Sequence, residues 1–378
     1  MKLLDICEFI IDCPHSTAKD EGYGFPLIRT PNIGKGRLLL NDVHKVSKDI
    51  YDKRNARAVP QKGDLIFARE APAGNVAVIQ KGQHVCLGQR TVLIRPNKTL
   101  ADANYLAYYL LAPNQQYELL GTANGATVAH VNLPIIRNLK IKLPSIAKQK
   151  KIGNILSAYD DLIENHQKQI ALLEEAARRL YREWFVALRF PGHESTPITD
   201  GVPEGWKKGT LNNITTFSRG KTITKAETRP GTVPVVAGGL TPAYYHDTAN
   251  TIAPVITVSG SGANAGFTKL YNENIFASDC SFTDSANNPY IYFVYEFLKE
   301  NSIKLLSLQK GSAQPHVYAK DINAMELLIP QEEITKKYCS LVTPYFTKIK
   351  VLQFQNQKLS EARDRLLPRL MREGGQAD

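Results

Sequence analysis

Apolar side chains recur at alternating steps of four and three residues along a stretch that runs from Pro144 to Trp184. Charged and amide side chains fill most of the positions between them, and neither Pro nor Gly interrupts the stretch after Gly153. This heptad seam predicts one long helix that packs against a second helix. Roughly forty residues at about 1.5 Å each make a rod of about 60 Å, too long to bury its stripe on one small domain. The seam residues are Ile152, Leu156, Tyr159, Ile163, His166, Ile170, Leu173, Ala177, Leu180 and Trp184.

The partner for this helix lies in the same chain, because the second half repeats the first at an offset of 186 residues, from Gly125 to Gly311. The same offset aligns His130 with His316. A repeat of this length means that one structural plan, a globular segment followed by a long helix, is used twice. The second seam comprises Tyr338, Val342, Tyr345, Ile349, Leu352, Asn356, Leu359, Arg363, Leu366 and Leu370.

Short β-like runs punctuated by Gly, Pro and Asn dominate both globular segments, and each segment contains one helical stretch. Strands mixed with one embedded helix predict an α+β fold rather than a βαβ array. In the first segment we expect strands at 25–33, 64–69, 76–80, 85–96 and 139–144, and a helix at 103–120 broken at Pro113. In the second segment we expect strands at 233–239, 254–260, 266–271, 275–282 and 325–330, and a helix at 289–308.

These segments give an expected domain order. Residues 1–144 form the first domain, 145–187 the first long helix, 188–205 a polar linker, 206–330 the second domain, 331–374 the second long helix and 375–378 a tail. Pro344 lies inside the second helix. We expect it to kink or break that helix, because proline lacks the N–H and its ring clashes with the preceding turn.

The composition is that of a basic protein without a membrane span. The 378 residues, 43% of them hydrophobic, leave room for two domains plus the helices. The formal net charge of +11 favours an anionic partner, with nucleic acid as the first candidate. No apolar run reaches about 18 residues, and the amino terminus, which we expect to be a strand or turn, is a poor signal peptide. Five scattered cysteines without a CxxC pair are typical of reduced thiols in a cytoplasmic protein.

The motifs of catalytic and cofactor sites are missing or incomplete. No GxxxxGK[ST] phosphate loop occurs, and the glycines at 260–266 form no GxGxxG and lead into a predicted strand. Residues 287–290, Asn-Asn-Pro-Tyr, resemble the Asn-Pro-Pro-Tyr loop of amino-methyltransferases but lack its second proline. No His, Cys or Asp residues stand at metal-ligand spacing. We therefore expect no catalytic residue, cofactor or metal.

Four stretches together carry a family pattern: residues 143–185, LPSIAKQKKIGNILSAYDDLIENHQKQIALLEEAARRLYREWF, with QKGSAQPHV (309–317), PVVAGG (234–239) and ITVSGSGANAGFT (256–268). They resemble the specificity subunit of type I restriction–modification systems, and the resemblance covers essentially the whole chain. It implies two target-recognition domains, each of which reads one half of a split site on double-stranded DNA. It also implies that the two helices pack antiparallel as a spacer.

The resemblance further implies partners and a location. The helices of such subunits dock methyltransferase (modification) subunits, which we expect to number two, and restriction subunits join through the assembled complex. The subunit itself carries no catalytic residue in this family, and a prokaryotic cytoplasmic location follows.

Geometry supports the same interpretation. Two copies of one unit on an antiparallel rod acquire a pseudo-two-fold axis, and half-sites on one face of B-DNA lie about 34 Å apart or a multiple of it. A rod of about 60 Å can span such a separation. The length of the helices would then fix the number of base pairs between the two half-sites that neither domain reads. The two globular segments share little side-chain identity, which predicts a non-palindromic target.

Base readout requires polar side chains on loops that can enter a groove, and any one of them can equally be a solvated residue or a phosphate contact. The candidates in the first domain are Arg29, Thr30, Asn32, Lys35, Arg37, Arg69 and Arg90. Those in the second domain are Arg219, Lys221, Tyr244, Tyr245, Ser259, Ser261, Asn264, Lys269 and Gln314.

Polar residues at repeated or seam positions have a structural interpretation. For His130 and His316 we favour a turn or helix-docking role over DNA contact. His166 and Asn356 interrupt the seams, where polar residues commonly fix register. Arg363 also departs from an apolar seam, which would fit a point where the second helix turns outward toward a partner.

Two other classes of function remain open from the sequence. One is a coiled-coil adaptor whose globular segments bind proteins, and the other is a self-contained methyltransferase. DNA affinity that falls steeply with salt would distinguish the favoured interpretation from the adaptor, and binding of a methyl donor by the isolated chain would reveal the methyltransferase.

Overall fold

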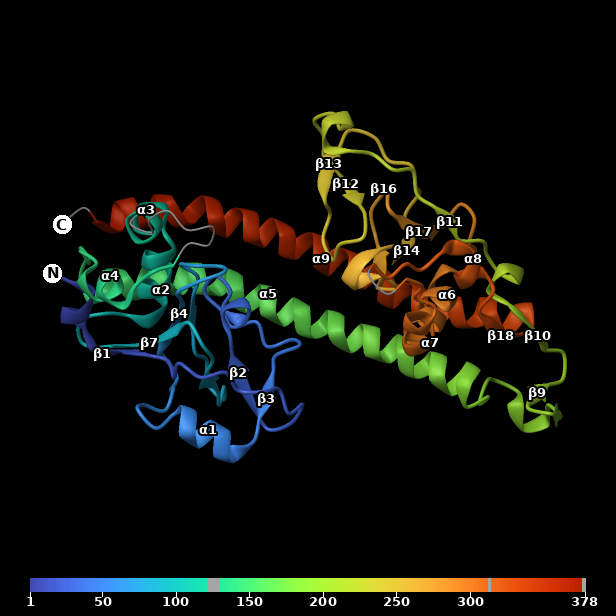
Figure 1. The fold of residues 1–378 in the computed structure, drawn as a ribbon, viewed down its shortest axis with the longest axis horizontal. Coiled ribbons are helices and arrows are strands. Elements are labelled where there is room, and N and C mark those ends of the chain that lie inside the picture. Colours follow the sequence, from blue (N-terminus) through green and yellow to red (C-terminus); the bar gives the residue numbers. More distant parts are fainter. Residues whose placement is uncertain (122–129, 312–313, 376–378) are drawn as a thin grey trace. The chain divides into compact units, whose positions relative to one another are not determined.

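The computed structural model describes residues 1–121, 130–311 and 314–375 and divides into two compact units (Figure 1). Unit 1 comprises Met1–His166 and Phe354–Asp378, and unit 2 comprises Gln167–Gln353. Each unit contains one globule and a portion of both long helices, α5 (Ile146–Tyr181) and α9 (Glu332–Gly375).

Unit 1 is built on an antiparallel four-stranded sheet with the order β1-β7-β4-β5. Its strands are β1 (Cys7–Asp12), β4 (Leu65–Ala68), β5 (Val76–Val78) and β7 (Thr91–Pro96). A second sheet has the order β3-β2-β6. It comprises β2 (Phe25–Ile28), β3 (Lys45–Val46) and β6 (Cys86–Leu87). The helices are α1 (Lys48–Arg54), α2 (Ala103–Leu111), α3 (Pro113–Gly121) and α4 (Leu133–Asn138).

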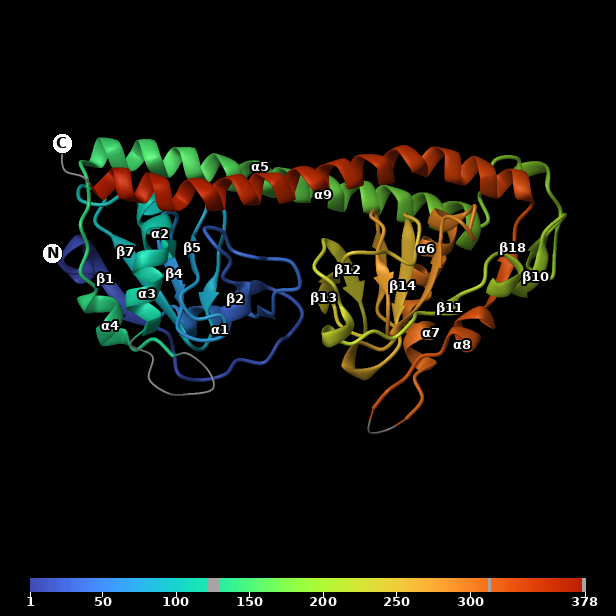
Figure 2. The same ribbon diagram turned by 90° about the horizontal axis from the view of Figure 1, so that it is seen from above.

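The core of unit 1 joins the sheet to the long helices through α2. Phe67 and Ile94 of the sheet, Tyr105 and Tyr108 of α2, and Leu156 of α5 belong to one cluster and are almost completely buried. Helix α2 lies between the four-stranded sheet and the long helices in Figure 2. Burial of large side chains on both faces of α2 therefore attaches the globule to α5.

Unit 2 repeats the sheet plan of unit 1 strand by strand. Its four-stranded sheet has the order β11-β17-β14-β15, and its second sheet has the order β13-β12-β16. In both units the second sheet pairs its central strand antiparallel on one side and parallel on the other. The strands are β11 (Ser218–Arg219), β12 (Val233–Val236), β13 (Tyr244–His246), β14 (Val255–Ser259), β15 (Thr268–Tyr271), β16 (Phe276–Ala277) and β17 (Cys280–Asp284).

The remaining elements of unit 2 connect this plan to the long helices. They are the hairpin β8 (Ile198–Thr199) and β9 (Val202–Pro203), the pair β10 (Lys207–Thr210) and β18 (Glu326–Ile329), and the helices α6 (Ile291–Glu300), α7 (Ser302–Ser307) and α8 (Ala319–Asn323). The end of α5 adds Tyr181 and, after it, Phe185 to an aromatic cluster with Phe293 of α6 and Tyr338 of α9. Packed rings thus hold both long helices against α6.

The two long helices contact each other inside each unit. In unit 1, Arg363 of α9 forms an ion pair with Asp160 of α5, and His166 Nδ1 lies 2.8 Å from Asn356 Oδ1. In unit 2, the hydroxyl of Tyr338 donates to the carbonyl of Ala177 at 3.2 Å. Twelve apolar or aromatic residues of the two predicted seams are all buried or partly buried: Ile152, Leu156, Tyr159, Ile163, Ile170, Leu173, Leu180, Tyr345, Ile349, Leu352, Leu359 and Leu366.

Asp160 is the centre of a buried polar network in unit 1. Its side chain is 4% exposed and accepts hydrogen bonds from the hydroxyl of Tyr108 and the guanidinium of Arg363. The loop at Gly36 packs on the same carboxylate, because a Cβ added there would lie 2.6 Å from Asp160 Oδ2. The next residue, Arg37, pairs with Asp161 at 2.7 Å. Globule, α5 and α9 therefore meet at one buried charge.

The interpretation of Arg363 as an outward-turning residue was wrong. Its side chain is only 12% exposed because it neutralises Asp160, which would otherwise be a buried, unpaired charge. Of the kink or break expected at Pro344, the break was wrong, since α9 is continuous from Glu332 to Gly375. Val342 and Phe346 on either side are buried, and this packing outweighs the loss of one backbone hydrogen bond.

Several boundaries differ from the expected ones for local reasons. Residues 139–144 form only a bridge between Lys140 and Lys2 instead of a strand. The expected strand at 85–96 is two strands, and the expected helix at 289–308 divides at Asn301 into α6 and α7. The break at Pro113 and the strand at the amino terminus are confirmed. Gly125 and the turn at 124–129 lie outside the described residues.

Removal of one partner of the Asp160–Arg363 pair should destabilise unit 1 by about 3–5 kcal/mol, because the other charge stays buried and unpaired. We expect Asp160→Ala and Arg363→Met each to show this loss, and the double variant to lose less than the sum. Denaturant unfolding of the two single variants, the double variant and the unaltered protein measures the four free energies of unfolding of this double-mutant cycle. Glu361→Ala, which breaks an exposed pair with Lys358 on the same helix, is the control and should leave the midpoint unchanged. Additive losses would mean that the two charges do not interact.

Unit 2 should lose stability as the pH rises, because of Glu296 on α6. This side chain is 3% exposed, and burial raises the pKa of its carboxyl to about 7, with a further contribution from the nearby carboxylates of Glu174 and Glu300. The unfolded chain releases this proton at lower pH, so that the native state becomes less stable between about pH 4.5 and 7. Glu296→Gln should therefore stabilise the protein at pH 8 by on the order of 1–3 kcal/mol, and not at pH 4.5.

Denaturant unfolding at the two pH values tests this expectation. The control is Glu361→Gln, because hydrogen bonds from Lys358 and Gln357 lower the pKa of that exposed carboxyl. Its replacement should give no stabilisation at pH 8. Equal effects of Glu296→Gln at both pH values would show that the ionisation of Glu296 does not limit stability.

Candidate nucleic-acid interface

The two globules build the same hairpin at the end of a central strand. In unit 1 the Gly74 N–H donates to the carbonyl of Ala68, the last residue of β4, at 2.9 Å. In unit 2 the Gly266 N–H donates to the carbonyl of Ser259, the last residue of β14, also at 2.9 Å. Ala68 therefore corresponds to Ser259, and the residues that follow, Arg69 and Glu70, correspond to Gly260 and Ser261.

The repeated histidines lie beside these strand ends. The N–H of Val131 donates to the carbonyl of Arg69 at 2.9 Å, and that of Val317 donates to the carbonyl of Gly260 at 3.1 Å. His130 and His316, which precede these valines, therefore occupy equivalent places. The ring of His130 contacts Glu70 and Arg69, while His316 pairs through its backbone with Lys310. Both contacts agree with the structural role expected of the histidines.

Strand register extends the correspondence to two neighbouring strands. Ala68 pairs with Thr91, and Ser259 pairs with Cys280, so Thr91 corresponds to Cys280. Arg90 precedes Thr91 and Asp279 precedes Cys280, and these two residues are therefore equivalent. The Cys13 N–H donates to the Thr91 carbonyl as the Gly220 N–H donates to the Cys280 carbonyl. The residues that precede Cys13 and Gly220, Asp12 and Arg219, are therefore equivalent as well. We call Asp12, Arg69, Glu70, Arg90 and His130 strand-end cluster 1, and Arg219, Gly260, Ser261, Asp279 and His316 strand-end cluster 2.

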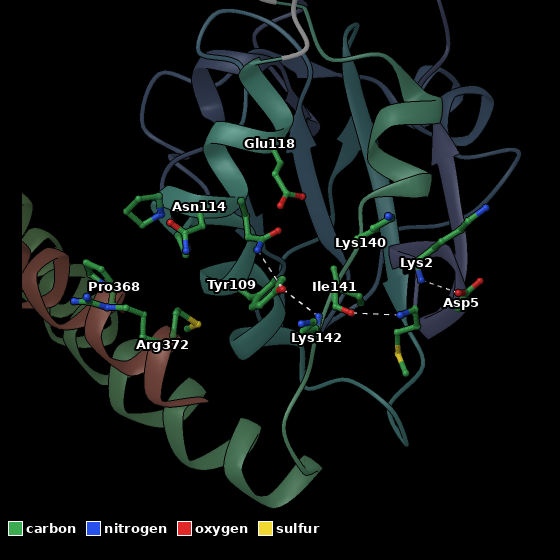
Figure 3. A pocket seen from close by; sticks show the side chains of 15 residues that line it. Lys2, Asp5, Tyr109, Asn114, Glu118, Lys140, Ile141, Lys142, Pro368 and Arg372 are labelled. Carbon is green, nitrogen blue, oxygen red and sulfur yellow. Dashed lines mark hydrogen bonds between the residues drawn. The ribbon is translucent and has the colours of Figure 1, made fainter. Parts of the chain in front are cut away.

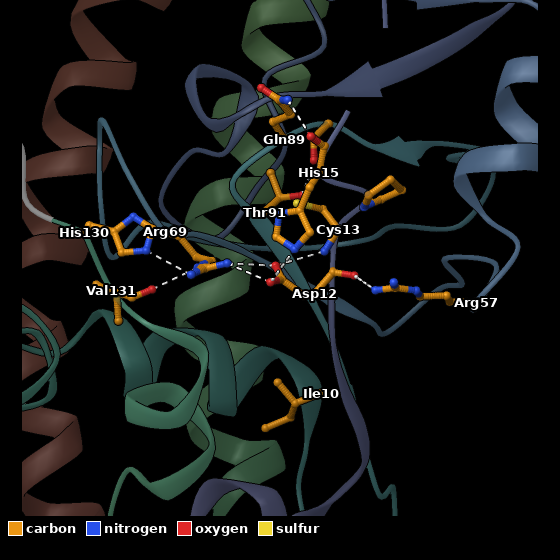
Figure 4. A network of polar contacts seen from close by, with 12 residues as sticks. Ile10, Asp12, Cys13, His15, Arg57, Arg69, Gln89, Thr91, His130 and Val131 are labelled. Carbon is orange, nitrogen blue, oxygen red and sulfur yellow. Dashed lines mark hydrogen bonds and ion pairs between the residues drawn. The ribbon is translucent and has the colours of Figure 1, made fainter. Parts of the chain in front are cut away.

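In strand-end cluster 1 one arginine is enclosed and another is exposed. Arg69 Nη1 lies 3.0 and 2.8 Å from the two oxygens of Asp12, and its Nε donates to the Val131 carbonyl at 3.0 Å (Figure 4). The Arg90 side chain is 62% exposed, and its Nη1 lies 2.5 Å from Glu70 Oε2. Arg90 also has a positive φ of 62°, a region that few residues with a side chain adopt. Cluster 1 thus presents one carboxylate-held arginine to solvent.

Strand-end cluster 2 presents a similar group from a different strand. The Arg219 side chain is 72% exposed, and its Nη2 lies 3.7 Å from Asp279 Oδ1. The Ser261 hydroxyl donates to the other oxygen of Asp279 at 2.5 Å. Arg219 and Asp279 border a hollow of about 170 Å³ that is also lined by His316 and Tyr318.

The other candidates from the sequence divide into two groups. Internal contacts engage Thr30, Asn32, Arg37, Arg69, Tyr244 and Ser259. The second group has exposed or partly exposed side chains and comprises Arg29, Lys35, Arg90, Arg219, Lys221, Tyr245, Ser261, Asn264, Lys269 and Gln314. Ser261 and Lys269 of the second group also form internal hydrogen bonds, to Asp279 and to the carbonyl of Leu240. All of these assignments stay predictions.

Three acids of the strand-end clusters, Asp12, Glu70 and Asp279, were missed by reasoning from the sequence. The candidates had been chosen as hydrogen-bond donors, so that carboxylates that hold an arginine were not considered. The offset between His130 and His316 was the available signal, because it marks the strand ends beside which these acids lie.

Unit 1 has a further hollow, of about 850 Å³, where α3 and the end of α9 meet residues 140–142 (Figure 3). The hydroxyl of Tyr109 accepts the Lys142 N–H there at 3.1 Å. None of its lining residues belongs to strand-end cluster 1. Among the described residues, no group of three His, Cys, Asp or Glu side chains is placed to hold a metal ion. The same part of the chain contains no helix that is both long and apolar enough to cross a bilayer.

The family model of the type I restriction modification DNA specificity domain matches residues 1–175 and 203–361. The chain belongs to this family, whose members recognise DNA sequence for restriction–modification systems.

Individual relatives agree with this assignment. The chain is 26% identical over 341 residues to the type I restriction enzyme MjaIX specificity subunit of Methanocaldococcus jannaschii, covering 82% of this chain and 77% of the relative. It is 20% identical over 432 residues to the HindI specificity subunit of Haemophilus influenzae, covering 91% and 93%. The fold is similar to the crystal structure of the type I S subunit from M. genitalium, with a TM-score of 0.55 at 16% identity over 98% of this chain and 95% of that one.

Proposed function

We propose that this chain is the non-catalytic DNA-recognition subunit of a type I restriction–modification complex, and that each globule reads one half of a bipartite, non-palindromic site. The observation that carries the proposal is the pair of strand-end clusters. The same backbone frame is built twice, with different polar side chains at equivalent positions. Two similar frames with different readout groups suit two half-sites of different sequence.

The long helices set the distance between the half-sites in this proposal, as an antiparallel coiled coil with pseudo-two-fold symmetry. Support comes from unit 1, where residue numbers rise along α5 and fall along α9 from the Asp160–Arg363 contact to the His166–Asn356 contact. A polar contact inside a seam penalises other registers, which would keep the spacing constant.

The long helices also dock methyltransferase subunits, in our proposal two of them, and restriction subunits join through the assembled complex. Both helices expose large apolar side chains that the described chain leaves uncovered, among them Leu172 of α5 at 70% exposure and Phe354 of α9 at 59%. Ile155, Leu162, Leu341 and Val351 are exposed on the same two helices. Exposed apolar side chains that recur along both helices support, in our proposal, a protein interface on these helices.

Exchange of residues 1–144 for the first domain of another family member should change one half of the recognised sequence and leave the other half intact. Co-expression with the cognate methyltransferase, followed by sequencing for modified bases, measures this. DNA affinity should also fall linearly with the logarithm of salt concentration, as release of counterions requires. A change in both halves, or in neither, would contradict modular reading. Absence of DNA affinity at low salt would favour a protein-binding adaptor.

Replacement of exposed apolar residues on the long helices should abolish co-purification with the methyltransferase. We expect the pair Leu172→Gln and Phe354→Gln to weaken that association at least about 10-fold, since anchors in an interface often contribute more than 1.4 kcal/mol. The control is Ile303→Gln on α7, which is 84% exposed and outside the long helices. A pull-down at matched concentration compares the double variant with the unaltered protein. Equal association of the two with the methyltransferase would place the docking surface elsewhere.

A further inference from the structure

The equivalent positions of the two strand-end clusters carry reversed charges. Asp12 at the end of β1 corresponds to Arg219 at the end of β11, and Arg90 before β7 corresponds to Asp279 before β17. Unit 1 thus exposes Arg90, which precedes β7. Unit 2 exposes Arg219, which ends β11, the strand beside β17.

Each exposed arginine lies beside a carboxylate that is less exposed than itself. Glu70 is 15% exposed and contacts Arg90, and Asp279 is 38% exposed and lies beside Arg219. A second contact orients each carboxylate, from the ring of His130 to Glu70 and from the hydroxyl of Ser261 to Asp279. The contact with Glu70 restricts the Arg90 guanidinium and leaves other N–H groups free, which lowers the entropy lost when it binds. The 3.7 Å between Arg219 and Asp279 is an ion pair without a hydrogen bond.

We propose that Arg90 and Arg219 each read one guanine, in the first and second half-site respectively, and that Glu70 and Asp279 are their positioning residues. This inference rests on the proposed function. A guanidinium has only donors, and guanine presents two acceptors, O6 and N7, in the major groove, so that the pair forms two parallel hydrogen bonds. Arg90 precedes β7, whose equivalent in unit 2 is β17, whereas Arg219 ends β11, the neighbour of β17. Because neighbouring strands lie about 4.8 Å apart, the two arginines are displaced from each other within the repeated frame, and the guanines occupy different places within the two half-sites.

The experiment uses the complete complex with its methyltransferase and a recognition site determined for the unaltered protein. Arg90→Gln should relax the requirement for one guanine in the first half-site, with a loss of about 10-fold to 100-fold in preference over the other bases. Arg219→Gln should do the same in the second half-site only. Each variant is the control for the other half. A merely phosphate-binding arginine would instead weaken binding to all sequences alike and make the salt dependence shallower.

The positioning residues are tested at the same guanines. Glu70→Gln and Asp279→Asn keep the shape of the side chain but remove its charge, and they should reduce the preference at the same position by a smaller factor than loss of the arginine. Arg229→Gln is the matched control, because Arg229 is an exposed arginine that pairs with Asp247 and does not belong to strand-end cluster 2. Thermal melting of every variant separates loss of folding from loss of readout.

The outcomes distinguish this inference from the function on which it rests. If the unaltered complex recognises a bipartite site and the arginine variants keep both guanine preferences, the assignment of Arg90 and Arg219 is overturned while the proposed function stands. If the unaltered complex recognises no DNA sequence, both the assignment of Arg90 and Arg219 and the proposed function are overturned.

Discussion

A single buried carboxylate, Asp160, holds the globule of unit 1 to both long helices. It receives the hydroxyl of Tyr108 from α2 and the guanidinium of Arg363 from α9, and the loop at Gly36 packs directly on it. A buried charge tolerates little displacement of its partners, because each lost hydrogen bond leaves it less solvated. The apolar seam supplies most of the burial, and this ion pair supplies the specificity of alignment in unit 1. At the offset of 186 residues Asp160 corresponds to Phe346 and Arg363 to Ala177, both apolar, so unit 2 has no equivalent ion pair at these positions.

The repeat preserves the backbone frame and varies the side chains on it. Strand order, parallel and antiparallel pairing and the hairpin hydrogen bonds recur in both units. The polar residues at the strand ends differ in kind and in charge. A frame of this sort separates stability from specificity, because buried strand residues fold the domain while exposed strand-end residues are free to change. This separation is the physical basis on which one fold can serve different DNA sequences.

The sequence predicted the elements whose signals are local. The heptad seam, the break at Pro113 and most strands follow from periodicity and punctuation over short windows. It was wrong about a break at Pro344 and about an outward turn at Arg363, where tertiary packing decides the outcome. The identity of a buried ion partner cannot be found from spacing, because Asp160 and Arg363 are 203 residues apart in the chain. The equivalence of Arg90 with Asp279 was equally hidden, since opposite charges give no sequence similarity and only strand register aligns them.

The close approach of Gly36 to Asp160 has a consequence for the evolution of the family's domains. Gly36 has a φ of 93° and no room for a Cβ, so a residue with a side chain at this position would prevent the close packing of the first globule on α5. A foreign globule recombined onto this helix would have to bring a glycine, or an equally open turn, to the same spot. Any exchange of this globule is therefore limited first by its fit against α5, and only afterwards by what the new globule can bind.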